Sequence, residues 1–136
     1  MPGRLYLDTS AVLRAVLETG TTPEIEERIE QAEVLITSRL AHVESARAFL
    51  RLRAAGIHGD ARLSDAEREV ADVLTRCELW EITPAVCELA GRVAPVKVLR
   101  ALDAIHLATF LLARRRLRGL ELLTADERLR EAAGNE

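Results

Sequence analysis

Two acidic residues follow apolar runs, at positions where a carboxylate could do chemistry. Asp8 directly follows Leu5–Leu7, and Asp126 comes shortly after Leu120–Thr124. If both runs are strands of one open α/β sheet, these acids lie at the carboxyl ends of strands, where such sheets bind ligands. Each acid also has an ordinary explanation, Asp8 as a helix N-cap and Asp126 as a first-turn acid favoured by the helix dipole.

A third acid, Glu44, interrupts the apolar face of a predicted helix. At a spacing of 3.6 residues per turn it shares that face with four apolar residues. A carboxylate among apolar side chains must be neutralised, paired or bound to a metal. An exposed pair with Arg47 would make it structural. The apolar neighbours are Leu40, Ala41, Ala48 and Leu52.

A fourth acid, Asp103, lies on the predicted helix Ala101–Ala113, which is apolar almost all round and therefore expected to be buried. His106 and Thr109 stand beside Asp103 at three-residue spacing. A pair with His106 or Arg100 would make Asp103 structural, but its position favours a functional site.

Four carboxylates at one end of a sheet would repel each other unless a cation lay between them. Hard oxygen ligands with no nearby cysteine or paired histidine suit Mg²⁺ or Mn²⁺ rather than Zn²⁺. Such a cation often pairs with a substrate phosphate, which points to phosphodiester chemistry.

The order of strands and helices explains how these acids could meet. Two helices are predicted between successive strands and one after the last, which predicts a three-layer α/β/α sandwich with a short parallel sheet. At 136 residues, the chain is expected to form a single domain, residues 1–136. The four predicted strands are Leu5–Leu7, Val34–Thr37, Leu79–Ile82 and Leu120–Thr124.

Local signals place several helix ends. Threonine followed by proline predicts helix starts at Thr22–Pro23 and Thr83–Pro84. Capping-box spacing predicts two more, at Ser64–Glu67 and Thr124–Glu127. Two glycines are expected just past the ends of helices that begin near residues 39 and 101. They are Gly56 and Gly119.

The composition limits the function classes. With a formal charge of −3, the chain is not a globally basic domain of the kind that binds nucleic acid through its overall charge. With 3% aromatic residues, it is not expected to offer an aromatic stacking platform for single-stranded RNA. The dense basic segment Arg114–Arg116, with Arg118, is either a solvated helix end or a phosphate contact. Two cysteines without zinc-like clustering, and no apolar stretch that could span a bilayer, make a cytoplasmic location the expectation, with no membrane contact.

The segments around the acids resemble the PIN-domain ribonucleases, and more narrowly the VapC-type toxins of bacterial toxin–antitoxin pairs. The resemblance spans nearly the whole chain, with the motifs in the expected order and spacing. It implies endonucleolytic cleavage of RNA, an inhibitory antitoxin protein encoded alongside, and a homodimer. The matching segments are Leu7–Ala11, Glu44, Arg100–Thr109 and Leu123–Leu129.

The resemblance also assigns roles. The acidic quartet would hold Mg²⁺ or Mn²⁺, with Glu44 orienting a water or completing the shell, and metal-activated water would leave a 5′-phosphate and a 3′-hydroxyl. Ser10 would support Asp8, and Thr124 would do the same for Asp126. The quartet is Asp8, Glu44, Asp103 and Asp126.

Two other residues, His106 and Trp80, are expected to have structural rather than catalytic roles. His106 is interpreted as a supporting core histidine rather than a general base, because chemistry by metal-activated water does not need it. Trp80, on the third predicted strand, is expected in the core.

Three alternatives are weighed against a ribonuclease. An aspartate-nucleophile phosphatase prefers a second acid two residues after the first, where this chain has Ser10. A receiver domain needs an adjacent acidic pair near its first strand, which the sequence lacks. A non-catalytic PIN-like module that binds RNA or protein stays open, although the intact quartet argues against it.

Overall fold

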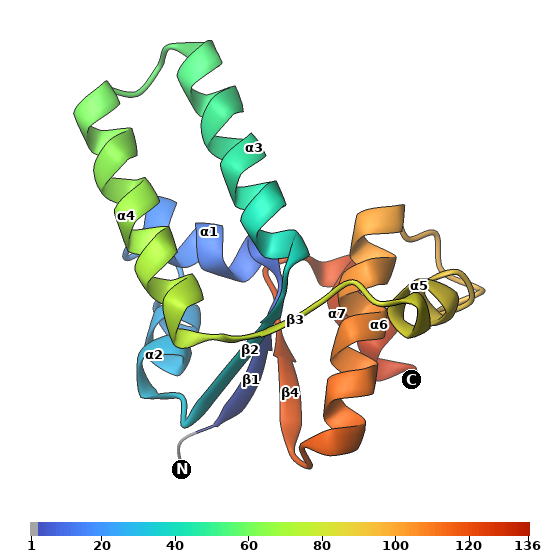
Figure 1. Cartoon of the computed structure of the whole chain (residues 1–136). Helices are drawn as coiled ribbons and strands as arrows, with labels where there is room; N and C mark the ends of the chain where they lie inside the picture. Colours follow the sequence, from blue (N-terminus) through green and yellow to red (C-terminus); the bar gives the residue numbers. More distant parts are fainter. Residues whose placement is uncertain (1–2) are drawn as a thin grey trace.

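Strands and helices alternate along the chain as predicted (Figure 1). The computed structural model describes residues 3–136. The elements are β1 (Arg4–Leu7), α1 (Thr9–Leu17), α2 (Pro23–Gln31), β2 (Val34–Ser38), α3 (Leu40–Ala55), α4 (Asp60–Arg76), β3 (Glu78–Trp80), α5 (Pro84–Ala90), α6 (Ala101–Arg116), β4 (Leu120–Leu123) and α7 (Glu127–Gly134).

The four strands form one parallel sheet in the order β3-β2-β1-β4. In the register of β1 with β4, Leu7 pairs with Leu123. Both strands therefore end at the same edge, and the residues that follow them, Asp8 and Thr124, lie side by side there.

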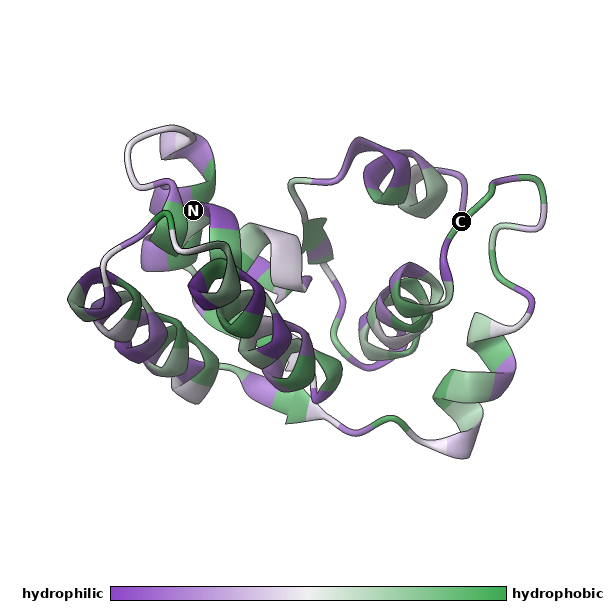
Figure 2. Cartoon of the chain, turned by 90° about the horizontal axis from the view of Figure 1, so that it is seen from above, coloured by the Kyte–Doolittle hydropathy of each residue, from purple (hydrophilic) through white to green (hydrophobic). Residues whose placement is uncertain are grey.

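Helices cover both faces of the sheet, which confirms the three-layer sandwich (Figure 1). Successive side chains of a strand point to opposite faces. In β1, Leu5 and Leu7 pack into the core shared with α1–α4, and Tyr6 packs into the core shared with α5–α7. Viewed from above, α3 and α4 lie side by side (Figure 2), and buried apolar residues of both belong to one core.

Most predicted element ends are confirmed. Proline opens α2 and α5, and the Thr83 hydroxyl caps α5 by accepting from the Val86 backbone N–H. Gly56 ends α3 with φ +68°, a backbone conformation that favours glycine. Gly119 also has a positive φ, but it lies in the turn before β4, because α6 ends at Arg116.

Three boundary predictions are wrong. Ser64 does not start a helix, because α4 begins at Asp60 directly after Gly59. The capping box predicted at Thr124–Glu127 is misplaced, because Asp126 rather than Thr124 is the N-cap of α7. The third strand is Glu78–Trp80, since the chain turns away from the sheet toward α5 after Trp80. Within residues 3–136, no helix is long and apolar enough to cross a membrane.

Candidate active site

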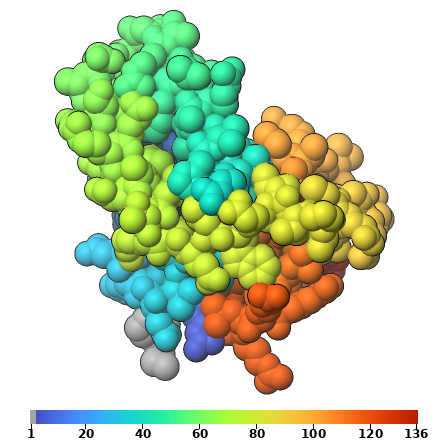
Figure 3. Space-filling model, viewed as in Figure 1, coloured from blue at the N-terminus to red at the C-terminus, as the bar shows by residue number. Residues whose placement is uncertain are grey.

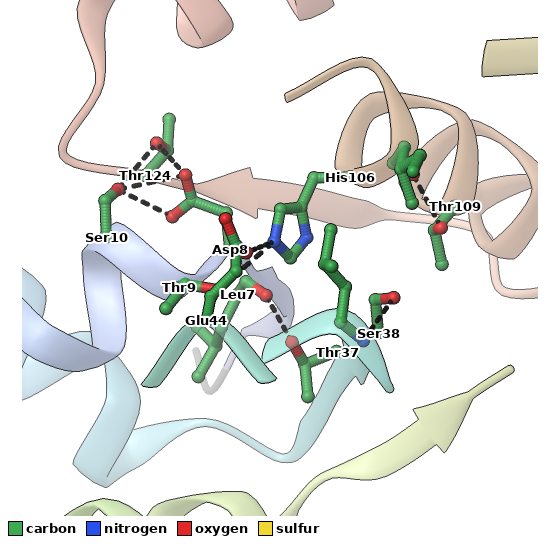
Figure 4. A network of polar contacts seen from close by, with 12 residues as sticks. Leu7, Asp8, Thr9, Ser10, Thr37, Ser38, Glu44, His106, Thr109 and Thr124 are labelled. Atoms are coloured by element: carbon green, nitrogen blue, oxygen red, sulfur yellow. Dashed lines mark hydrogen bonds and ion pairs between the residues drawn. The ribbon is translucent and has the colours of Figure 1, made fainter. Parts of the chain in front are cut away.

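Asp8 is buried at the carboxyl end of β1 and is held by three donors (Figure 4). Its Oδ1 accepts from the backbone N–H of Ala11 at 3.1 Å, so the N-cap interpretation is correct. The Ser10 hydroxyl lies 2.8 and 2.9 Å from the two carboxylate oxygens, as predicted. The Thr124 hydroxyl donates to Oδ2 at 2.6 Å. Asp8 is thus fixed in position by its neighbours.

Thr124 supports a different acid from the one that was expected. Its hydroxyl donates to Asp8 and accepts from the backbone N–H of Asp126 at 3.0 Å, without contacting the Asp126 carboxylate. The reason is the register of β1 with β4, which places the two residues that follow the strands side by side. Thr124 links the two acids, one by side chain and one by backbone.

Glu44 reaches from α3 into a second polar network (Figure 4). Its Oε1 accepts from the Thr9 hydroxyl at 2.6 Å and lies 2.7 Å from Nε2 of His106. Thr9 and His106 are also 3.2 Å apart. Glu44 forms no ion pair with Arg47 in the part of the chain that the structure describes. The structural explanation based on that pair therefore does not hold.

His106 is buried and connects Glu44 to the sheet. Its Nδ1 lies 2.8 Å from the Tyr6 hydroxyl. Burial raises the pKa of Tyr6 well above its ordinary value, so the phenol keeps its proton and can donate it to Nδ1. A bond in that direction would leave Nε2 as the donor that faces Glu44. This arrangement agrees with a supporting histidine.

Asp103 lies in the first turn of α6, half-buried. The helix is buried at His106–Leu111 and at Ala113, but Leu102 is 46% exposed, so the expectation of burial all round fails at its first turn. Arg100 approaches Asp103 only to 3.9 Å, and its side chain is 79% exposed. His106 bonds to Glu44 and Tyr6 instead. Neither proposed pair binds Asp103 tightly.

Asp126 caps α7 and keeps one carboxylate oxygen for other partners. Its Oδ1 accepts from the backbone N–H groups of Arg128 and Leu129, at 2.9 and 3.4 Å. The capping role explains why an acid is stable there. It does not exclude a second role through Oδ2.

The acids influence each other electrostatically. Burial raises the pKa of Asp103, and the negative charge of Asp126 raises it further, as do those of Asp8 and Glu44. Burial also raises the pKa of Asp8, against the opposing effect of its hydrogen bonds. For Glu44, burial is outweighed by the hydrogen bonds from His106 and Thr9, and its pKa is lowered. The structure therefore brings all four predicted acids into one electrostatic neighbourhood.

The donor set fits Mg²⁺ or Mn²⁺ in kind, because hard carboxylate oxygens are the ligands these ions prefer. Within residues 3–136, no three histidine, cysteine, aspartate or glutamate side chains stand close enough to ligate one ion. Asp8 and Glu44 are fixed by hydrogen bonds, so Asp103 and Asp126 would have to move toward Asp8 to share a cation with it.

Two members of the site were not identified from the sequence. Thr9, beside Asp8, bridges Glu44 and His106, and its place in the segment Leu7–Ala11 is a signal that could have found it. Nothing in the sequence marked Tyr6 as part of the site, because a tyrosine between two leucines of a buried strand is fully explained as a core residue.

Comparison with known proteins identifies the family. The family model for the PIN domain matches residues 5–135. Ribonuclease VapC46 of Mycobacterium tuberculosis is 32% identical over 132 residues, covering 95% of this chain and 89% of the relative. Ribonuclease VapC35 of the same species is 33% identical over 131 residues, with the same coverage.

Two solved structures share the fold. The crystal structure of PAE2754 from Pyrobaculum aerophilum has a TM-score of 0.67 and 22% identity, covering 96% of this chain and 79% of that one. VapBC2 from Rickettsia felis, crystallised with a DNA fragment from its promoter, has a TM-score of 0.60 and 11% identity, covering 90% of this chain and 98% of that one. With the family model and the sequence relatives, these findings show that the chain belongs to the PIN-domain family, together with the VapC ribonucleases.

Proposed function

We propose that this protein is a metal-dependent endoribonuclease and the toxin of a VapBC-type toxin–antitoxin pair. The observation that supports the proposal best is the support of buried Asp8 by the Ser10 and Thr124 hydroxyls, with Thr124 also bonded to the backbone N–H of Asp126. Besides burial, the charges of the other three acids of the quartet raise the pKa of Asp103, so the fourth acid lies in the same electrostatic neighbourhood. The VapC ribonucleases among its relatives support the same activity. A cytoplasmic location, where such an enzyme would meet RNA, is part of the proposal.

A bound Mg²⁺ or Mn²⁺ would neutralise the scissile phosphate and lower the pKa of a water nucleophile. Asp8, Asp103 and Asp126 would hold the ion. Ser10 and Thr124 keep the Asp8 carboxylate oriented through the bonds described above. Glu44, held by Thr9 and His106, would accept a hydrogen bond from the attacking water and orient it.

Cleavage of an end-labelled RNA pool tests the activity. The protein is incubated with Mg²⁺, with Mn²⁺ or with EDTA, alongside Asp103→Asn. Asp72→Asn serves as a matched control, because Asp72 is exposed on α4 away from the site. We expect cuts only with metal, unchanged in Asp72→Asn and lost in Asp103→Asn, with 5′-phosphate ends.

Two results would count against this activity. Cyclic 2′,3′-phosphate ends would contradict hydrolysis by water. Cuts that persist in Asp103→Asn would contradict the role of the quartet. A protein that binds RNA with no metal-dependent cleavage would instead be the non-catalytic module considered above.

The antitoxin is the second part of the proposal. Exposed apolar side chains precede Asp103 directly, with Val96 and Val98 89% and 88% exposed and Leu102 46% exposed. Exposed apolar side chains so close in sequence to Asp103 suit an apolar segment that also carries an arginine for the carboxylates. We expect mixing with the small protein encoded next to this chain to protect both from proteolysis. Absence of mutual protection would argue against that partner.

A homodimer is also proposed. Val43, Leu50 and Ile57 are exposed at seven-residue spacing along and just beyond α3, which gives the helix one apolar stripe. Sedimentation equilibrium should show a dimer that Leu50→Glu dissociates. A wild-type monomer across the concentration range would contradict this.

A further inference from the structure

An open cavity lies on the molecule far from the acids, between β3, α5 and the last turns of α6. These three elements meet on the face seen in Figure 3. The cavity has a volume of about 550 Å³, a size suited to a small organic ligand. We name it the Trp80 groove. The residues that matter for its chemistry are Trp80, Val86, Leu112, Arg115 and Arg116.

Trp80 is the only tryptophan of the chain, and it is half-buried at the edge of the sheet rather than enclosed in the core. The expectation of a core role is therefore only partly right. The guanidinium of Arg116 lies 5.6 Å from the centre of its ring. This cation–π contact orients the guanidinium, and Arg116 itself is exposed.

The charges around the groove favour an anion. Within residues 3–136, neither Arg115 nor Arg116 forms an ion pair, and both are exposed. Glu81 also lines the groove, but Arg39 neutralises it through two bonds of 3.0 and 2.7 Å. With Glu81 paired, the lining carries two guanidinium groups against the single carboxylate of Glu78. An apolar wall with exposed guanidinium groups is a combination that a nucleotide can satisfy with its base and its phosphate.

The groove and Asp103 lie at opposite ends of one helix. Thirteen residues of α6 separate Asp103 from Arg116, which corresponds to roughly 20 Å along the axis at 1.5 Å per residue. A single-stranded RNA of several nucleotides could extend from Asp103 to the Trp80 groove. A shorter substrate bound at the acids could not contact the groove.

We propose that the Trp80 groove binds one nucleotide of a single-stranded RNA whose cleaved bond lies at the acidic site. The base stacks on the Arg116 guanidinium, whose other face rests on Trp80, and a neighbouring phosphate pairs with Arg115. The proposal rests on the proposed function, because it takes RNA as the substrate. It also gives the basic segment a role beyond a solvated helix end.

The single tryptophan makes the groove directly observable. Short single-stranded RNA oligonucleotides, oligo(A) and oligo(U), are titrated into the wild-type protein in EDTA, which separates binding from cleavage. We expect RNA to change Trp80 fluorescence. Arg116→Ala should weaken binding about tenfold, the effect of losing one stacked base. Arg115→Ala should also make RNA affinity less sensitive to salt concentration, by the amount expected for the loss of about one phosphate contact.

Arg62→Ala is the matched control, since Arg62 is exposed on α4, across the sheet from the groove. It should bind RNA like the wild type. RNA binding measured by anisotropy that leaves Trp80 fluorescence unchanged would overturn the proposal. So would equal affinities of Arg116→Ala and Arg62→Ala. Trp80 fluorescence that changes with protein concentration alone would assign the groove to a second copy of the chain, and also overturn it.

The inference and the proposed function can fail separately. A protein that cleaves RNA equally well with and without Arg116 is a nuclease whose substrate avoids the groove. A protein that binds RNA at Trp80 but shows no metal-dependent cleavage has the groove without the catalytic activity.

Discussion

Asp8 and Glu44 each accept a hydrogen bond from a side chain of a distant segment, whereas within residues 3–136 no such bond reaches the carboxylate of Asp103 or Asp126. The first two receive hydroxyl or imidazole donors at 2.6–2.9 Å. Among residues 3–136, the one ion-pair partner of Asp103 is the exposed Arg100 at 3.9 Å, and Asp126 uses one oxygen as a helix cap. We infer that Asp8 fixes where a cation would bind, that Glu44 is held in place for the attacking water, and that Asp103 and Asp126 complete the ligand set. The variants below test that division.

The largest effect on stability is expected from Thr124→Val, which removes a donor from buried Asp8. We expect the free energy of unfolding to fall by about 1–3 kcal/mol, the usual cost of leaving a buried polar group without one of its hydrogen-bond partners. RNA cleavage should fall about 10–100-fold, as for other residues that orient metal ligands. Urea unfolding and the cleavage rate measure the two effects.

Thr37→Val is the matched control, because the buried Thr37 hydroxyl donates to the backbone carbonyl of Leu7 rather than to a carboxylate. It should lose stability while keeping most of the cleavage rate. Equal loss of cleavage in both variants would mean that general loosening of the sheet edge, rather than the Asp8 carboxylate, limits the reaction.

The second prediction concerns the Glu44 network. Glu44→Gln and His106→Gln should each reduce cleavage about 10–100-fold. The double variant should be little worse than either, because the two residues act as one unit. A cycle of cleavage rates for the four proteins measures the coupling. If the double variant lost cleavage by the product of the two single losses, His106 would instead be an independent catalytic group. Complete loss of cleavage in a folded His106→Gln variant alone would lead to the same conclusion.

Asp126 allows capping to be separated from chemistry. Asp126→Ala removes the cap and should lower the free energy of unfolding by about 0.5–2 kcal/mol. Asp126→Asn retains a capping oxygen and should unfold like the wild type in urea, yet lose metal-dependent cleavage. Full cleavage by Asp126→Asn would show that this acid only caps α7.

The smallest effect is expected from Arg100→Ala. An exposed ion pair at 3.9 Å contributes little, so the free energy of unfolding should change by less than about 0.5 kcal/mol. Cleavage should stay near the wild-type rate. A large loss of either quantity would show that Arg100 holds Asp103, contrary to the distinction drawn between the two pairs of acids.

The order of elements and the placement of the acids were predictable because they depend on short-range patterns. Apolar runs, Thr–Pro helix starts and Gly56 each report on a few neighbouring residues. Asp8 and Asp126 could be placed at strand ends for the same reason. The false capping box at Ser64 shows the limit of such signals, since an equally good start at Asp60 lay one turn earlier.

The hydrogen bonds within the site could not be predicted because they join distant segments. Thr124 bonds Asp8 across 116 positions of the sequence, and Tyr6 bonds His106 across 100. Their partners follow from strand register and from the side of the sheet on which α6 packs. The opening around Trp80 likewise depends on β3 being an edge strand, which a sequence pattern alone does not reveal.

Isothermal titration calorimetry with Mn²⁺ alone shows whether Asp8, Asp103 and Asp126 form one cation site. We expect the wild type and Asp72→Asn to bind Mn²⁺ with equal affinity. Asp8→Asn, Asp103→Asn and Asp126→Asn should each bind at least about tenfold more weakly. A wild-type protein that does not bind Mn²⁺, or an Asp103→Asn variant with wild-type affinity, would contradict this expectation.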